Sequence, residues 1–413
     1  MRWMKRPGIR AGRTMKRRFA AVAVIVVSTL ALSLGATSPA AADPKFPSWA
    51  DVQRAKHSVA AKKAEVTKLT GLITSLQNQA AAAGKVAAVR GEEYLNAKSE
   101  LDAATAAATK LKDQADAARQ KAQASAAEAG QLAAQLAREG DGNITLNLFL
   151  NGHDASDLLD VLGTMSKLSE ASAKIFAQAE QDQKTSSALS DQAAVAAAAR
   201  AKKKTAAAAA LASAKTASDQ AQAKVAFENK EQSTMTAQLA SLKGTSKSVE
   251  ASYYAGVAWE KKQEEQTTPP PDGVPSGPIP GAPDGSKAAG AIHFVEAQLG
   301  KPYVLDGAGP NVWDCSGLTL KAYSSVGVYI GTHSATNQYN TLRSENRLVP
   351  LSERQPGDIL WYSNGGSTSA TKYHVTLYIG NNEMIEAPYP GVGVRIAALR
   401  YGDLVPYAGR PTG

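Results

Sequence analysis

The residues best suited to chemistry are a thiol, an imidazole and a carboxylate in the C-terminal third of the chain. Cys315 is the only cysteine among the 413 residues, and it directly precedes a stretch that is typical of a helix. His374 begins an apolar stretch typical of a strand, and Glu386 follows on what we expect to be the return strand of a hairpin. These are the parts of a cysteine nucleophile, its base and its orienting group.

The expected helix start gives a physical reason for choosing Cys315. A thiol is a poor nucleophile until it ionises, and the N-terminus of a helix stabilises the thiolate. Asp314 is the expected cap, and the free N–H groups around Ser316 can bind an oxyanion. His374 can face the thiol across the sheet–helix interface, while Glu386 holds the other ring nitrogen. We therefore predict Cys315, His374 and Glu386 as catalytic residues, with Asp314 and Ser316 as oxyanion or substrate contacts.

Other interpretations of these residues stay open. A cysteine chosen at random is more often a small buried side chain than a nucleophile, and an odd cysteine can also pair with a partner's thiol. His333 is a rival base, although it lies in a loop-like segment with no matching carboxylate. The sequence has no Cys-x-x-Cys pair and no His-Glu-x-x-His motif, so we expect neither a metal nor another cofactor.

The first 42 residues have the layout of a signal peptide. Eight lysines and arginines, with no acidic residue, precede an apolar run at 19–34, and Ala40-Ala41-Ala42 offers small residues for cleavage. The apolar run is short for a membrane span, which makes an uncleaved anchor the less favoured alternative. The formal net charge of +9 includes these eight charges, so the rest of the chain carries +1 and gives no support for nucleic-acid binding. We expect a secreted protein.

Residues 43–266 predict an all-α domain, because they are rich in alanine, lysine and glutamine and nearly free of proline. Apolar residues recur every seven positions at Val52, Val59, Val66 and Ile73, with Leu69 and Leu76 three positions further on. This is the a/d pattern of a coiled coil. Gly140 and Gly142 interrupt it, and a second long helix is expected to reach about Lys262, so we predict an antiparallel coiled-coil hairpin. Periodicity alone leaves open whether the hairpin is a spacer or a docking arm.

Two further segments complete the predicted organisation. Residues 267–286 alternate proline with glycine, which indicates a semi-extended linker. Residues 287–413 are enough for one compact domain. Two helix patterns, at 288–299 and 315–326, precede short strand patterns at 358–362, 374–379, 383–387 and 392–396. Strands that arrive consecutively after helices indicate an α+β domain with an antiparallel sheet.

This last domain resembles the NlpC-type (p-sixty) cysteine peptidases in four blocks that occur in the same order: Gly300-Lys301-Pro302-Tyr303, Trp313-Asp314-Cys315-Ser316-Gly317-Leu318, Gln355-Pro356-Gly357-Asp358-Ile359-Leu360 and His374-Val375-Thr376-Leu377-Tyr378-Ile379-Gly380. The resemblance covers about residues 287–406 and implies a papain-like fold. It also implies that Cys315 is the nucleophile, His374 the base and Glu386 the orienting residue, with Tyr303 near the oxyanion and substrate. The third position is often His, Asn or Gln in the family, whereas secreted actinobacterial Rip-type hydrolases carry Glu there.

The resemblance implies a cell-wall enzyme. Its members cut the peptide stems of peptidoglycan, commonly between D-glutamate and the diamino acid, so we expect a secreted, wall-associated cysteine endopeptidase of cell separation or wall remodelling. The order of coil, linker and peptidase also resembles division hydrolases whose coil blocks the active site until a membrane partner of the FtsEX type releases it. The apolar run Leu146-Asn147-Leu148-Phe149-Leu150 is consistent with a docking surface. The alternatives are a catalytically silent adaptor that activates another hydrolase, and an amidase or acyltransferase on the same fold.

Overall fold

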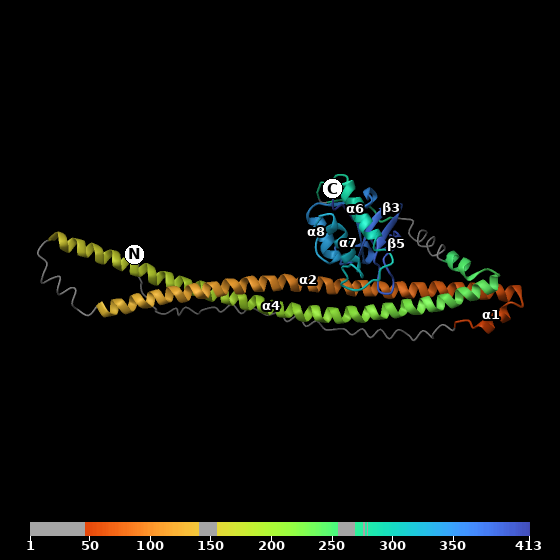
Figure 1. Ribbon diagram of the computed structural model, residues 1–413, viewed down its shortest axis with the longest axis horizontal. Coiled ribbons are helices and arrows are strands. Elements are labelled where there is room, and N and C mark those ends of the chain that lie inside the picture. Colours follow the sequence, from red (N-terminus) through yellow and green to blue (C-terminus); the bar gives the residue numbers. More distant parts are fainter. Residues whose placement is uncertain (1–45, 140–154, 255–268, 276, 279) are drawn as a thin grey trace, which may run out of the picture. The chain divides into compact units, whose positions relative to one another are not determined.

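Two long helices make up most of the first half of the protein. The computed structural model describes residues 46–139, 155–254 and 269–413, except 276 and 279, so the expected signal peptide and the apolar run 146–150 lie outside the described residues. Helix α2 spans Val59–Glu139 and helix α4 spans Ala155–Lys243. Lys203 lies 2.5 Å from Glu100, and Lys121 lies 3.0 Å from Asp182. Residue numbers therefore rise along one helix as they fall along the other, and the predicted antiparallel arrangement is confirmed (Figure 1).

The paired helices bury small and apolar residues along their contact. One cluster, joined by the short helix α1 (Trp49–Ala55), holds Val52, Leu69, Ile73, Leu76, Met235, Leu239 and Leu242. Farther along, the contact consists of alanines such as Ala87 and Ala221. The prediction for Val59 is wrong: it is 87% exposed, because the chain turns between α1 and α2 and Val59 is the first residue after that turn.

The second long helix is shorter than predicted. It ends at Lys243, and Gly244 follows with a φ of +73°, the left-handed conformation that commonly terminates a helix. Residues 247–254 are helical again. In the described part of the chain, no helix combines the length and the apolar composition that crossing a bilayer requires.

The C-terminal domain is built on a six-stranded sheet. The strands are β1 (Leu348–Pro350), β2 (Ile359–Ser363), β3 (Lys372–Gly380), β4 (Glu383–Glu386), β5 (Arg395–Ala398) and β6 (Leu404–Gly409). Their order is β1-β6-β2-β3-β4-β5 and every neighbouring pair is antiparallel, which confirms the predicted sheet. Asn381 and Asn382 both have positive φ, as the tight turn of the β3–β4 hairpin requires. Strands β1 and β6 were not predicted.

Three helices pack on this sheet: α6 (Gly285–Glu296), α7 (Cys315–Ser325) and α8 (Ala335–Ser344). Two single-turn helices, η1 (Leu351–Glu353) and η2 (Asn364–Gly366), flank β2. Helix α8 was not predicted, whereas α6 and α7 lie close to their expected positions.

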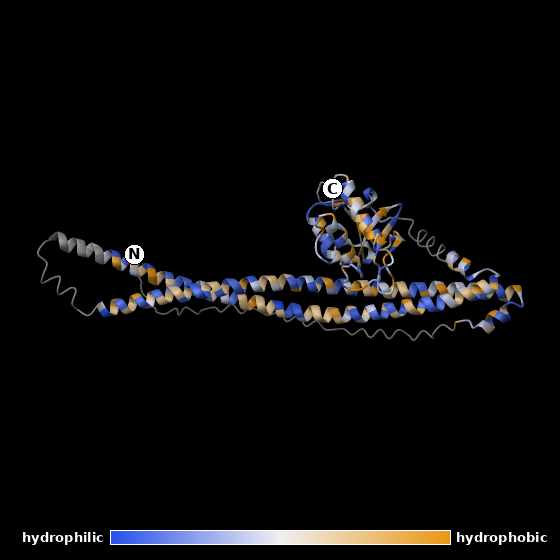
Figure 2. Ribbon diagram, in the orientation of Figure 1, coloured by the Kyte–Doolittle hydropathy of each residue, from blue (hydrophilic) through white to orange (hydrophobic). Residues whose placement is uncertain are grey.

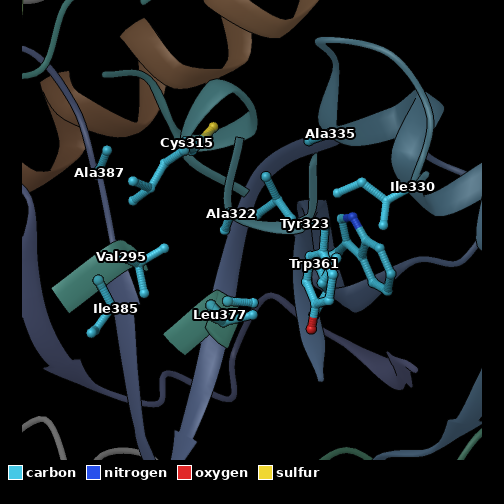
Figure 3. Close-up of a cluster of buried hydrophobic side chains, with 14 of the residues drawn as sticks. Val295, Cys315, Ala322, Tyr323, Ile330, Ala335, Trp361, Leu377, Ile385 and Ala387 are labelled. Carbon is cyan, nitrogen blue, oxygen red and sulfur yellow. The ribbon is translucent and has the colours of Figure 1, made fainter. Parts of the chain in front are cut away.

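The helices cover one face of the sheet. Alternate residues of a strand point to opposite faces, and Ile359 and Trp361 belong to the core under the helices, whereas Leu360 and Tyr362 belong to a second cluster. Trp361 stacks edge-to-face on Tyr339 of α8 with ring centroids 5.3 Å apart. Figure 2 shows apolar residues gathered inside this domain, and Figure 3 shows part of the core, with Trp361 beside Tyr323 and Cys315 among the labelled residues. This packing fixes the start of α7 against β3.

The described part of the expected linker lies against the C-terminal domain. The Gly273 N–H donates to the Pro406 carbonyl at 2.9 Å, and the Tyr407 hydroxyl donates to the Val274 carbonyl at 2.7 Å. Asp284 caps α6, so the last residues of the predicted linker already belong to the domain's first helix. The segment is therefore a strap on the domain rather than a free spacer over its described residues.

Candidate active site

The structure places Cys315 at the first turn of α7. Asp314 adopts an extended conformation before the helix, and its carboxylate accepts hydrogen bonds from the Gly317 N–H at 2.7 Å and the Ser316 hydroxyl at 3.1 Å. The backbone N–H groups of Ser316 and Val375 act to lower the pKa of the Cys315 thiol and so favour its ionisation. The thiol therefore lies where the N-terminus of α7 meets strand β3. The strand residue that acts on it, Val375, directly follows His374 in the sequence.

His374 and Glu386 form a buried hydrogen-bonded pair across the β3–β4 hairpin. His374 Nε2 lies 2.8 Å from Glu386 Oε2, and the two side chains are 3% and 0% exposed. The other ring nitrogen, Nδ1, has no hydrogen-bond partner among the described residues. With the Nε2 proton on the bond to Glu386, Nδ1 is the ring atom that remains available to take a proton.

Two arginines that the sequence analysis did not include hold Glu386. Arg400 donates to both carboxylate oxygens, at 3.0 and 2.7 Å, and Arg395 donates twice to Oε1, at 3.1 and 2.9 Å. Burial opposes the ionisation of Glu386, but Arg400, Arg395 and His374 outweigh it and keep its pKa well below the ordinary value. Burial also lowers the pKa of His374; Glu386 opposes this effect, but burial and the two arginines together prevail. His374 is therefore a neutral base near neutral pH.

The same surroundings keep the thiol protonated in this arrangement. Burial raises the pKa of Cys315 well above its ordinary value, and the negative charges of Asp314 and of Glu92, a residue of α2, raise it further. The two backbone N–H groups at the thiol oppose this effect but do not overcome it. Cys315 is only 6% exposed. The thiol that the sequence predicts as the nucleophile is thus shielded from water.

The other expected contact residues are near the thiol, with different roles for their side chains. Tyr303 pairs with Trp313 in an isolated bridge and is 9% exposed; burial and the charges of Cys315 and Asp314 raise its pKa well above the ordinary value. Ser316 is fully buried, and its hydroxyl is used on Asp314. Of the two polar groups of Ser316, the backbone N–H, which acts on the thiol, is therefore the one suited to bind an oxyanion.

The expectation that His333 lacks a carboxylate is wrong. Its Nε2 lies 2.8 and 2.9 Å from the two oxygens of Asp314, and its Nδ1 lies 3.4 Å from Asp306. Burial lowers the pKa of His333, but these two carboxylates outweigh it and raise the pKa. The partners are distant in sequence, so the loop-like context gave no sign of them. His333 thus supports the cap of α7, and both of its ring nitrogens face carboxylates.

A carboxylate of α2 is seated at the N-terminus of α8, beside the thiol. Glu92 accepts hydrogen bonds from the Ser334 hydroxyl at 2.7 Å and from the N–H groups of Thr336 and Ala335 at 2.9 and 3.1 Å. Ser334 is the cap of α8, and an anion is favoured at this end of a helix. Glu92 is 2% exposed, and burial raises its pKa to about 7 despite these hydrogen bonds.

Further contacts continue along the same face of α2. Lys85 lies 2.6 Å from Asp403, and Lys98 lies 2.5 Å from Asp306. A Cβ atom on Gly84 would lie 2.5 Å from the ring of Tyr389, and one on Gly91 would lie 2.9 Å from Leu305. Glycine inside a helix costs about 1 kcal/mol relative to alanine. The close approach of the C-terminal domain is a physical reason for two glycines here.

Across residues 46–139, 155–254 and the described part of 269–413, no group of three or more His, Cys, Asp or Glu side chains is arranged to hold an ion.

Comparison with known proteins agrees with this geometry. Residues 300–405 match the NlpC/P60 family. The C-terminal domain is an NlpC/P60 domain. Over 153 residues the chain is 33% identical to the peptidoglycan endopeptidase RipA of Mycobacterium tuberculosis, a match that covers 34% of this chain and 30% of RipA. Over 132 residues it is 34% identical to the peptidoglycan endopeptidase RipB of the same organism, covering 29% of this chain and 51% of RipB.

A solved structure of the peptidoglycan hydrolase RipB from Mycobacterium tuberculosis is 30% identical to this chain, with a TM-score of 0.27, and covers 31% of this chain and 66% of that one. The matches to the curated relatives RipA and RipB span about a third to a half of their lengths. The similarity therefore concerns the NlpC/P60 domain, and the activity of the whole protein is a matter for proposal.

Proposed function

We propose that this protein is a secreted, cell-wall-associated peptidoglycan hydrolase that acts as a cysteine endopeptidase in cell separation or wall remodelling. Its substrate would be the stem peptide, cut between the D-glutamyl residue and the diamino acid. The observation that carries the proposal is that Cys315 begins α7, which packs on the strand β3 that carries His374 of the buried His374–Glu386 pair, in an NlpC/P60 domain. Relatives of this domain are named peptidoglycan endopeptidases.

The geometry suits acyl transfer through a thioester. Nδ1 of His374 takes the proton of the Cys315 thiol, and the thiolate attacks the carbonyl carbon of the scissile amide. Backbone N–H groups at the start of α7, with the hydroxyl of Tyr303, stabilise the oxyanion. The imidazolium returns its proton to the amine as the C–N bond breaks. His374 then activates a water molecule that hydrolyses the thioester and regenerates the thiol, while Glu386 stabilises each imidazolium.

The coil would restrain this chemistry until it is released. Glu92 and Lys85 attach α2 to the C-terminal domain, and the Glu92 carboxylate adds to the effects that keep Cys315 protonated. The strap formed by the described part of residues 269–283 keeps the two parts of the chain at a high effective concentration, which favours such a contact. A membrane protein of the FtsEX type is the partner we propose for release.

Digestion of purified wall and of defined muropeptides, with products identified by mass spectrometry, tests the activity. The fragment 269–413, which keeps the strap, should cut faster than the whole chain at equal molarity, and Cys315→Ala should be inactive in either form. New amino termini on the diamino acid identify the endopeptidase, whereas cleavage at the sugar–peptide bond would identify an amidase. An inert fragment that still stimulates another wall hydrolase would replace the proposal with the adaptor function.

A further inference from the structure

A pocket beside the catalytic base has no role in the chemistry described so far. It has a volume of about 270 Å³, and its lining includes His374, Tyr373, Tyr389, Arg395 and Asp403, together with Lys85 of α2. Both arginines in the lining, Arg395 and Arg400, already donate to Glu386. Asp403 is the only carboxylate in the lining, within the part of the chain that the structure describes.

Asp403 is prepared to bind a cation. Its Oδ2 accepts from the Tyr373 hydroxyl at 2.7 Å and its Oδ1 from the Gly365 N–H at 2.9 Å, which fixes the carboxylate. Burial opposes its ionisation, but these bonds and the one from Lys85 lower the pKa of Asp403. The ammonium of Lys85 lies 2.6 Å from Asp403 and 5.2 Å from the centre of the Tyr373 ring. A carboxylate next to an aromatic face is a recognised arrangement for an ammonium group.

The position of the pocket indicates which part of a substrate would enter it. Lys85 and Glu92 are seven residues apart on one helix, about 10 Å along its axis. Between them, Ala88 lines the pocket with His374, while Gly91 lies near the hydroxyl of Tyr303. His374 must protonate the amine that leaves, so the leaving residue lies on the His374 side and the acyl part on the Tyr303 side. The pocket therefore receives the residue that follows the scissile bond.

We propose that Asp403 and Tyr373 form a subsite for the side-chain ammonium of the residue after the scissile bond, and that Lys85 occupies this subsite while the coil is docked. The subsite rests on the proposed endopeptidase function and gives a reason for its preference for a diamino acid. Lys85 carries an ammonium on a flexible four-carbon chain, as the side chain of a lysine-type stem peptide does. While Lys85 lies in the pocket, its side chain therefore mimics the side chain of the leaving residue.

The test uses the whole chain with Glu92→Arg, which releases the coil, and matched pairs of stem peptides. One pair carries lysine or norleucine in third place; the other carries diaminopimelate or 2-aminopimelate, so each pair differs only in the ammonium group. Asp403→Asn keeps the oxygen that accepts from the Gly365 N–H, and its NH2 group can donate to the Tyr373 oxygen, but it loses the charge. It should lower kcat/KM for the preferred ammonium peptide about tenfold, mainly through KM, and change the matched neutral peptide less than twofold. Equal losses in both peptides would mean that Asp403 is only structural.

Binding to the Cys315→Ala form of the same released chain separates this subsite from the proposed reaction. Calorimetry should show tighter binding of the ammonium peptide than of its neutral partner, and Asp403→Asn should remove the difference. If this preference appears although no peptide is ever cut, the subsite stands and the endopeptidase proposal fails. If peptides are cut with no preference for ammonium, or none binds, the subsite is wrong.

A separate experiment, in the chain without Glu92→Arg, tests whether Lys85 occupies the subsite. Lys85→Met keeps most of the aliphatic chain and removes the ammonium, and it should speed alkylation of Cys315 severalfold. Lys112→Met is the matched control, because Lys112 pairs with Asp116 on the same helix. Asp403→Asn and Lys85→Met should not add when combined, since each removes the same contact. Fully additive effects would contradict the placement of Lys85 in the subsite.

Discussion

The centre of this protein holds two fully buried carboxylates, Glu386 and Glu92, whose surroundings act in opposite directions. Glu386 belongs to the NlpC/P60 domain, and two arginines and a histidine of that domain bind it, so its pKa stays well below the ordinary value. Glu92 comes from the coil, and its hydrogen-bond donors at the start of α8 are uncharged hydroxyl and backbone N–H groups. Burial therefore prevails and raises its pKa to about 7.

The difference separates a permanent contact from a reversible one. A buried charge with a full set of charged partners is costly to remove, because its partners are then left unpaired. A buried carboxylate held by neutral donors gains less from its site and returns to water at lower cost. The His374–Glu386 pair is thus part of the folded domain, whereas the coil contact is suited to release.

We expect the largest effect, a loss of stability, when Glu386 loses the charge that balances its two arginines. Glu386→Gln leaves Arg395 and Arg400 without their anion, and we expect the free energy of unfolding to fall by about 3 kcal/mol, at the lower end for buried pairs because both arginines are partly exposed. Urea denaturation followed by tryptophan fluorescence measures this loss. Glu383→Gln, at the start of the same strand, is the control and should cost less than about 0.5 kcal/mol. Similar losses in the two variants would show that the arginines do not depend on Glu386.

The second effect is a pH dependence of the coil contact. The pKa of Glu92 is about 7 when docked and about 4.5 in water, so the docked state binds the proton more tightly. Docking is therefore strongest below about pH 4.5 and weakens by about 3 kcal/mol as the pH rises to 7, above which it is constant. Glu92→Gln is neutral throughout and should remove this dependence.

The ratio of Cys315 reaction rates in the wild type and in Glu92→Gln measures this, because the intrinsic pH dependence of the thiol cancels. A dipyridyl disulfide serves as the reagent, since it reacts at acid pH as well. The ratio should rise between about pH 4.5 and 7 and then level off. A flat ratio across that range would mean that Glu92 does not change its protonation on docking.

The smallest effect is expected at the edge of the coil contact. Lys98 and Asp306 form an ion pair whose side chains are 41% and 29% exposed, and such pairs contribute at most about 1 kcal/mol. Lys98→Met should therefore speed alkylation of Cys315 by no more than about fivefold. Lys110→Met, an exposed position on the same helix, should leave the rate unchanged. An effect at Lys98 as large as one at Glu92 would remove the distinction between the centre and the edge of this contact.

The parts of the site that depend on local signals were predictable from the sequence. Asp314 before Cys315 is a common helix cap, and the helix begins there. Asn381 and Asn382 favour the tight turn that brings Glu386 back beside His374. The cap and the turn need only neighbouring residues, so the start of α7 and the pairing of His374 with Glu386 could be predicted, whereas the catalytic roles stay predictions.

The parts that depend on tertiary contacts were not predictable. Arg395 and Arg400 are ordinary surface residue types, and nothing in their neighbourhood points to Glu386. The position of Glu92 depends on how α2 meets the cap of α8, a helix whose sequence is mostly polar. One signal was available: Gly84 and Gly91, two turns apart, are poor residues for a helix interior unless another surface comes close to that face.

Reactivity of the thiol tests most directly whether the coil covers a ready-made active site. Cys315 is the only cysteine in the chain, so alkylation reports on this position alone. Glu92→Arg puts a cation at the positive end of α8 and should release the coil, with alkylation near neutral pH about a hundredfold faster than in the wild type. Glu93→Arg, at an adjacent position that is 43% exposed, should react at the wild-type rate. Equal rates in the wild type and in Glu92→Arg would contradict a coil that shields the nucleophile.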